Sequence, residues 1–157
     1  MARASKRDHI VTQATALFLD QGFKGTSVDA VITDCAVSKP TVYKHFPDKT
    51  ILMTAVVDHW LADRPAVTLD AKTLSTFWQE LTDYWWTTEH MAMYRLVIAE
   101  GWRFAPAAKR FWQEFDQPWQ DAAAAWLTAH APNSAACHIE SVGAELWRRL
   151  RRPGAAG

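Results

Sequence analysis

Several features that commonly mark a function are scarce in this sequence. It has two cysteines, Cys35 and Cys137, too far apart for a disulfide framework or a metal site with short ligand spacing. No apolar run approaches the length of about 18 residues needed to span a membrane, and the N-terminus MARASKRDH lacks the apolar stretch of a signal peptide. We therefore expect a cytoplasmic protein with reduced thiols and no membrane association.

Patterns typical of catalysis are missing as well. The six histidines show no HExxH or paired spacing, and no glycine-rich phosphate loop occurs. The acidic residues Glu114 and Asp116 are two apart, a spacing that turns them to different sides of a helix. We expect no enzyme, no cofactor and no metal site.

Charge and tryptophan are unevenly distributed along the chain. Residues 1–50 hold seven Lys and Arg against five Asp and Glu, whereas residues 51–147 hold six against twelve. All nine tryptophans lie at or after Trp60. The simplest interpretation is a mildly basic domain over 1–50 and an acidic, aromatic domain over 51–157; random scatter of charge is the alternative.

Apolar residues recur at helical spacing along the whole chain, which predicts an all-α fold without strands. In the first segment Gly22 is the expected C-terminal stop. Pro118 is expected to kink the longest helix. The first predicted helix spans the segment RDHIVTQATALFLDQGF. The later predicted helices cover 27–34, 38–45, a stretch from Asp48 to before Pro65, 70–87, 89–104, 106–130 and 134–151.

Residues suited to cap helices precede three of these segments. Thr26, with Asp29 three positions later, predicts a capping-box-like start for the second helix. Ser38 is expected to cap the third helix, where Pro40 falls in the first turn and breaks no hydrogen bond. Asp48 is expected to cap the fourth.

The two short helices 27–34 and 38–45 have the layout of a helix-turn-helix, whose second helix lies in the major groove of DNA. Val42 and Phe46 are expected to hold that helix from behind. Its other faces carry cations and hydroxyls that suit phosphates and base edges. A solvated basic face on a surface helix is the alternative. The predicted DNA-contacting residues are Lys6, Thr26, Ser38, Lys39, Pro40, Thr41, Tyr43, Lys44, His45 and Lys49.

Aromatic residues of the second domain recur at spacings that place many on inward faces. Such stripes are usually core, and the competing interpretation is a pocket for a hydrophobic or aromatic effector. The predicted ligand-binding residues are Trp78, Trp85, Tyr94, Trp102, Arg103, Trp112 and Phe115. Candidates for polar anchors of such a ligand are His90, Arg95, Glu100 and Arg103.

The segment GFKGTSVDAVITDCAVSKPTVYKHFPDKTIL resembles the DNA-binding domain of the TetR/AcrR family of bacterial transcriptional regulators. The matching positions are Gly22, Phe23, Thr26, Val37, Ser38, Tyr43, Phe46, Lys49 and Leu52. The later segment YRLVIAEGWRFAPAAKRFW is similar to the C-terminal domain of the AefR-like branch. The resemblance implies an all-helical homodimer that represses promoters by binding an operator in double-stranded DNA. A small molecule bound in the C-terminal domain is expected to release it.

The chain departs from the family pattern in places. Ile32 stands where the family has a small residue, and Ala36 stands at a turn where the family has glycine, so Ala36 is expected in a left-handed conformation. The family closes with two long helices that form a dimer bundle, and one candidate, 134–151, is present. A truncated, a diverged and a frameshifted C-terminus are the alternatives, and dimerisation is the least secure of the implied properties. The alternative function is a helical ligand-binding or interaction protein that has lost operator binding.

Overall fold

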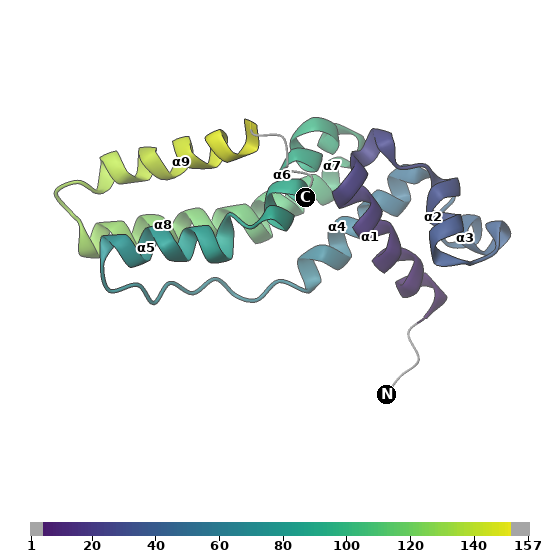
Figure 1. Ribbon diagram of the computed structural model, residues 1–157, viewed down its shortest axis with the longest axis horizontal. Helices are drawn as coiled ribbons and strands as arrows, with labels where there is room; N and C mark the ends of the chain where they lie inside the picture. The colour runs from purple at the N-terminus through teal and green to yellow at the C-terminus, as the bar shows by residue number, and fades with distance from the viewer. Residues whose placement is uncertain (1–4, 152–157) are drawn as a thin grey trace. The chain divides into compact units, whose positions relative to one another are not determined.

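A computed structural model describes residues 5–151, and all of its regular structure is helical (Figure 1). Within 5–151 no residue forms a strand, which confirms the predicted all-α class. Residues 1–4 and 152–157, the ends of the two predicted domains, lie outside the described residues. Among the helices of this described part, none is long and apolar enough to cross a membrane.

The chain forms two compact units. The first contains the residues up to Arg64 together with Leu96–Phe111, and the second contains Pro65–Arg95 together with the residues from Trp112 onward. The domain boundary expected after residue 50 falls just inside α4, whereas the first unit includes the whole of this helix.

The first unit starts with four helices and ends with three shorter segments. Its helices α1 to α4 span Lys6–Gly25, Val28–Cys35, Lys39–His45 and Lys49–Ala62. The end of α6 (Thr88–Glu100), the 3-10 turn η2 (Gly101–Phe104) and α7 (Ala105–Phe111) complete it. The core residues include Ile10, Phe18, Val31, Val42 and Val56, all at most 1% exposed.

Local signals set the ends of these helices much as the sequence predicts. Helical geometry in α1 breaks at Gly22, whose φ of 73° is the left-handed conformation that glycine adopts without steric cost. The side chain of Asp48 accepts a hydrogen bond of 2.9 Å from the backbone N–H of Ile51 and so caps α4, as predicted. The capping-box prediction for Thr26 is wrong by one residue, because Ser27 is the N-cap of α2 and accepts from the N–H of Ala30.

The turn between α2 and α3 has the predicted left-handed residue. Ala36 has φ of 50° and ψ of 34°, and it ends α2. His9 Nε2 lies 3.0 Å from the carbonyl oxygen of Cys35 and, since a carbonyl only accepts, donates to it. This bond ties α1 to the turn that orients α3.

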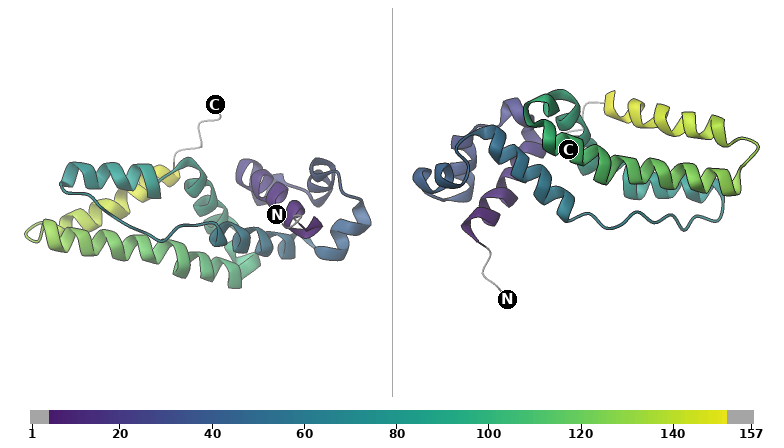
Figure 2. Two further views of the ribbon diagram at one scale, coloured as in Figure 1. Left: turned by 90° about the horizontal axis from the view of Figure 1, so that it is seen from below. Right: turned by 180° about the vertical axis from the view of Figure 1, so that it is seen from behind.

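The second unit is built from α5 (Leu74–Glu80), the start of α6, α8 (Gln117–His130) and α9 (Ala135–Arg151). Helix α9 packs antiparallel beside α8, as all views in Figures 1 and 2 show. Two π-helical turns interrupt the regular helices, η1 at Leu81–Trp85 and η3 at Trp112–Asp116. The second of these lies directly before Pro118, where the sequence predicts a kink.

Stacked aromatic rings fill the core of the second unit. Phe77 and Trp126 stack with centroids 4.5 Å apart, and Trp85 and Trp119 stack at 5.6 Å with an interplanar angle of 6°. The indole N–H of Trp126 donates to the carbonyl of Ala71, so this buried polar atom is satisfied. For these residues, the expectation that most aromatics are core is confirmed.

Candidate DNA-binding surface and ligand cavity

Helix α3 turns its apolar side inward and its polar side to solvent. Val42 is fully buried and Phe46 is 1% exposed, so these two residues anchor the helix from behind as predicted. The side chains of Ser38, Lys39 and Lys44 are exposed on the other faces. A helix-turn-helix needs this arrangement, because the reading helix has to present polar groups while its back is held by the core.

Lys39 is engaged in contacts within the first unit. Its Nζ lies 2.9 Å from Oδ1 of Asp29 on α2 and 5.7 Å from the ring centroid of Tyr43. The hydrogen bond that Lys39 donates to Asp29 raises the pKa of Lys39, because it stabilises the charged ammonium. Both side chains of the ion pair are exposed, and solvent-exposed pairs of this kind exchange readily for other ionic partners.

The exposed side of α3 also carries hydroxyl groups and rings. Ser38 is the N-cap residue, as predicted, but its hydroxyl shares a hydrogen bond of 2.8 Å with that of Thr41 and bonds no backbone N–H. Pro40 is exposed in the first turn, while Tyr43 is 38% exposed and His45 is half-buried.

Two further predicted cations lie at the starts of neighbouring helices. Lys6 opens α1 and is exposed. Lys49 opens α4, and its Nζ lies 4.3 Å from the ring centroid of Phe23. Partial burial lowers the pKa of Lys49, because desolvation disfavours the charged ammonium.

The structure removes the hydroxyl of Thr26 from the group of candidate phosphate contacts. Thr26 is 1% exposed, and its hydroxyl lies 2.9 Å from the carbonyl of Gly22 and 3.1 Å from that of Leu17. Its role is to close the end of α1, because it satisfies carbonyls that the helix leaves free. The other nine predicted residues are exposed or half-buried, and their contact with DNA remains a prediction.

The predicted ligand-binding residues do not form one cluster. Trp85, Tyr94 and Phe115 are buried in the second unit. Trp78 is half-buried and Trp112 is 37% exposed.

Two members of that set belong to the first unit. Trp102 is 71% exposed, and the guanidinium of Arg103 lies 4.1 Å from a ring centroid of Trp102. Arg103 Nε also donates to Glu100 at 2.8 Å, and Lys24 Nζ lies 3.2 Å from the same carboxylate. The hydrogen bond from Arg103 is the main reason that the pKa of Glu100 lies below its usual range, and the contact with Lys24 lowers it further.

The polar anchors expected around an effector are used inside the protein. His90 Nδ1 lies 2.9 Å from the carbonyl of Trp85 and donates to it. Arg95 donates to the carbonyls of Arg149 and Leu150 at the end of α9. These contacts give His90 and Arg95 structural roles.

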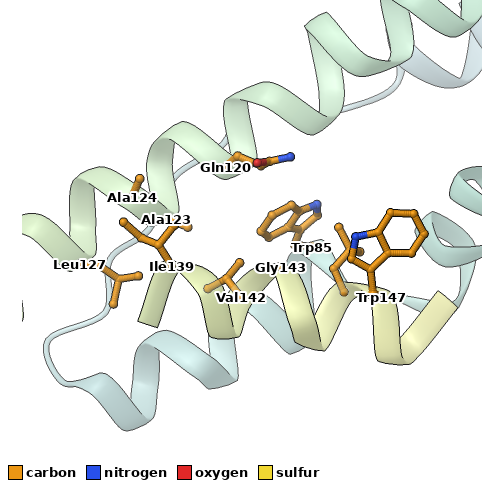
Figure 3. A pocket seen from close by; sticks show the side chains of 10 residues that line it. Trp85, Gln120, Ala123, Ala124, Leu127, Ile139, Val142, Gly143 and Trp147 are labelled. Atoms are coloured by element: carbon orange, nitrogen blue, oxygen red, sulfur yellow. The ribbon is translucent and has the colours of Figure 1, made fainter. Parts of the chain in front are cut away.

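A cavity of about 170 Å³ lies between α8 and α9, with Trp85 at its base (Figure 3). Trp85 is the one member of the predicted set that lines it. Sequence reasoning missed Gln120 on α8 and Gly143 and Trp147 on α9. The one available signal is the helical spacing of Ile139, Val142 and Leu146 in the predicted helix 134–151, since all three line the cavity.

A buried hydrogen-bond network adjoins this cavity. The N–H of Trp85 donates to the hydroxyl of Tyr94 at 2.9 Å, and that hydroxyl donates to Asp116 Oδ1 at 2.6 Å. Gln120 Nε2 donates to Asp116 Oδ2, also at 2.6 Å. Burial raises the pKa of Asp116 although both hydrogen bonds oppose the shift, and burial next to Asp116 raises that of the Tyr94 hydroxyl far above its usual value.

Comparison with known proteins assigns both parts of the chain to one family. Residues 10–56 match the model of bacterial regulatory proteins of the tetR family. Residues 72–137 match the model of the C-terminal domain of AefR-like transcriptional repressors. The first match contains the helix-turn-helix, and the second contains α5, α6 and α8 of the second unit.

Individual relatives are similar to less than half of the chain. The transcriptional repressor DhaR of Mycobacterium sp. (strain GP1) is 32% identical over 63 residues, which are 40% of this chain and 32% of DhaR. The transcriptional activator FasR of Mycolicibacterium smegmatis is 32% identical over 57 residues, 36% of this chain and 26% of FasR. The chain thus matches a third or less of the length of these relatives.

A solved structure extends the likeness beyond the first unit. The crystal structure of a putative TetR-family regulator from Mesorhizobium loti aligns with a TM-score of 0.57 at 25% identity, over 76% of this chain and 65% of that one. The helix-turn-helix geometry, both matching family models and this shared fold agree. The chain belongs to the TetR family of bacterial transcriptional regulators.

Proposed function

We propose that this protein is a ligand-responsive, DNA-binding transcriptional regulator without enzymatic activity, a repressor that a small hydrophobic effector releases from its operator. The observation that carries the proposal is the exposed polar surface of α3, with Ser38, Lys39 and Lys44, held from behind by the buried Val42 and Phe46. Such a protein acts in the cytoplasm, where the bacterial chromosome lies.

The exposed and half-buried residues of this surface divide into two roles. Lys6 and Lys49, at the starts of α1 and α4, suit phosphate contacts, which add affinity that falls with salt but carry no sequence information. Lys39, Thr41 and Lys44 on α3 suit the groove, since donors on a reading helix discriminate base edges. Ser38, Pro40, Tyr43 and His45 complete the proposed contact surface.

We assign repression and a homodimer by family. DhaR, which is similar over 63 residues, is named a repressor, and residues 72–137 match a domain of AefR-like repressors. A two-fold dimer binds two half-sites about one helical turn of DNA apart, roughly 34 Å, or a multiple of this distance. The operator is therefore expected to be a palindrome with that spacing.

The test is a titration of the protein against duplexes from the DNA upstream of its own gene, followed by fluorescence anisotropy at several salt concentrations. Lys44→Ala is expected to weaken binding by about 1–3 kcal/mol and to relax the preference among duplexes, because a groove-facing donor reads base edges. Lys109→Ala, which removes an exposed cation of α7, is the matched control and should leave binding unchanged. Equal binding of all duplexes, with equal effects of both variants, contradicts the proposal.

The second candidate is a helical ligand-binding protein without operator binding. The ion pair between Lys39 and Asp29 favours it, because this pair occupies a cation of the reading helix. The same titration separates the two candidates, since this protein would show no preference among duplexes at any salt concentration.

A further inference from the structure

Apolar side chains predominate in the lining of the cavity between α8 and α9. The lining residues that are exposed to solvent are Gln120, Ile139, Gly143 and Trp147. Trp85, Leu127 and Val142 form part of its wall, and none of the described residues that line it is charged. An ion placed there would lose part of its hydration without gaining a counter-charge, so the lining disfavours charged ligands. An apolar cavity of about 150 Å³ accommodates a benzene-sized molecule, and this cavity, at about 170 Å³, has room for one such ring.

Gln120 contributes the single amide side chain of the lining (Figure 3). Its Nε2 donates to Asp116, whose other carboxylate oxygen already accepts from Tyr94. A carboxylate offers acceptors only, so it fixes the amide with the nitrogen toward Asp116. The side chain of Gln120 is exposed, and its oxygen Oε1 remains as an acceptor without a protein partner among residues 5–151.

We propose that this cavity binds a neutral single-ring phenol, whose hydroxyl donates to Oε1 of Gln120 while its ring lies against Trp85 and Val142. Size selects one ring, the uncharged lining selects a neutral molecule, and the free acceptor selects a hydrogen-bond donor. The inference names the effector class of the proposed regulator and rests on that function for its regulatory meaning.

The first test measures binding of a matched series of probes to the full chain by isothermal titration calorimetry, without DNA. Para-cresol has the donor, toluene has none, para-methylanisole has an acceptor only, and para-toluate is charged. We expect para-cresol to bind roughly fivefold more tightly than toluene or para-methylanisole, the effect of one neutral hydrogen bond. Para-toluate should not bind. Equal affinity for para-cresol and toluene, or tighter binding of para-toluate, overturns the proposal.

The second test fills the cavity. An added Cβ on Gly143 meets no atom within 4 Å, so Gly143→Leu extends into the cavity without a backbone clash and replaces a poor helix former in α9. We expect binding of para-cresol to fall at least tenfold while the helical circular dichroism is unchanged. Ala144→Leu, at the exposed neighbouring position, is the control and should bind as the unmodified protein does. Unchanged binding by Gly143→Leu places the ligand elsewhere and overturns the proposal.

A third variant tests the acceptor. Gln120→Leu should remove the preference for para-cresol over toluene, whereas Gln117→Leu, which changes an exposed glutamine bonded to Asp121, should preserve it. A preference that survives in Gln120→Leu contradicts the role of Oε1. These binding measurements need no operator, so a failure of the phenol site is distinguishable from a failure of the proposed DNA binding. If para-cresol binds but does not change operator affinity, the site stands and its role as effector site falls.

Discussion

The hydroxyl of Tyr94 on α6 donates a hydrogen bond of 2.6 Å to Oδ1 of Asp116 on η3, and both side chains are buried in the second unit. The same hydroxyl accepts the indole N–H of Trp85, so it satisfies two buried groups at once. Partly satisfied buried networks are costly, because each unpaired polar group loses its hydration without compensation. Tyr94 is therefore the central member of this network.

Tyr94→Phe should destabilise the protein by about 1–3 kcal/mol, since it leaves Asp116 short of a donor and Trp85 without an acceptor. The measurement is the free energy of unfolding from urea titration followed by circular dichroism. Tyr84→Phe removes a hydroxyl from a side chain that is 60% exposed, and it should change stability by less than about 0.5 kcal/mol. Equal effects of the two variants would contradict a structural role of the Tyr94 hydroxyl.

The raised pKa of Asp116 predicts how its contribution to stability changes with pH. The folded carboxyl holds its proton to a higher pH than the unfolded one, which titrates near about 4. The resulting stabilisation is fully present below the unfolded pKa and is lost as the pH rises through the folded pKa. Thermal melts at several pH values measure the stability of the unmodified protein minus that of Asp116→Asn. This difference should fall as the pH rises from the unfolded to the folded pKa of Asp116. A difference that grows with pH contradicts a raised pKa of Asp116 in the folded protein.

The helix-turn-helix could be predicted closely because its signals are local. Gly22 breaks α1 through its own backbone, Asp48 caps α4 through its own side chain, and Ala36 takes the left-handed turn that the tight connection requires. The error at Thr26 is also local, since Thr26 and Ser27 are both good caps and three-dimensional packing decides between them. The family resemblance covers this same region.

The cavity and its network could not be predicted in this way. Gln120 and Asp116 are four residues apart on one segment, but their partner Tyr94 is 22 residues from Asp116, and periodicity carries no information on such pairings. The sequence does place Glu114 and Asp116 on different sides, and the structure confirms this, with Glu114 exposed and Asp116 buried. Trp102 fits the aromatic pattern yet is 71% exposed, because helical spacing alone does not show which face meets a neighbour.

Relief of the strained turn should stabilise the first unit. Ala36 has φ of 50°, a conformation that costs a residue with a Cβ about 1 kcal/mol more than glycine. Ala36→Gly should therefore raise the free energy of unfolding by up to about 1 kcal/mol in a urea titration. Ala30→Gly, inside α2, should lower it by about 0.5–1 kcal/mol. If both changes lower stability equally, the turn is not strained.

Removal of the carboxylate beside the reading helix should strengthen DNA binding. Asp29 holds Lys39 in an exposed ion pair, which contributes little to folding but competes with DNA for the cation. Asp29→Asn should increase operator affinity by up to about fivefold, the effect of one added hydrogen bond from Lys39 to a base edge. Asp20→Asn, at an exposed position of α1, controls for the change in net charge. An equal gain from both variants indicates a general charge effect and not release of Lys39.

The orientation of the Gln120 amide should reverse in Asp116→Asn. The Tyr94 hydroxyl receives the Trp85 N–H and has to donate onward, so it requires the carbonyl oxygen of the new side chain. The NH₂ group of that side chain then faces Gln120, and two facing donors are unfavourable. Gln120 satisfies the contact by turning its own oxygen inward, which leaves its NH₂ group toward the cavity.

A cavity that presents a donor should prefer a ligand with an acceptor. We therefore expect Asp116→Asn to bind para-methylanisole more tightly than para-cresol, reversing the preference of the unmodified protein by about fivefold in each direction. Calorimetric titration with both probes measures this, and Asp121→Asn, whose carboxylate bonds the exposed Gln117, is the control that should keep the original order. Asp116→Asn removes an acidic group from η3, and Asp121→Asn removes one from α8. Because both variants lose one negative charge, a general loss of charge cannot produce the reversal. An unchanged order in Asp116→Asn would mean that the carboxylate does not set the polarity of the cavity through Gln120.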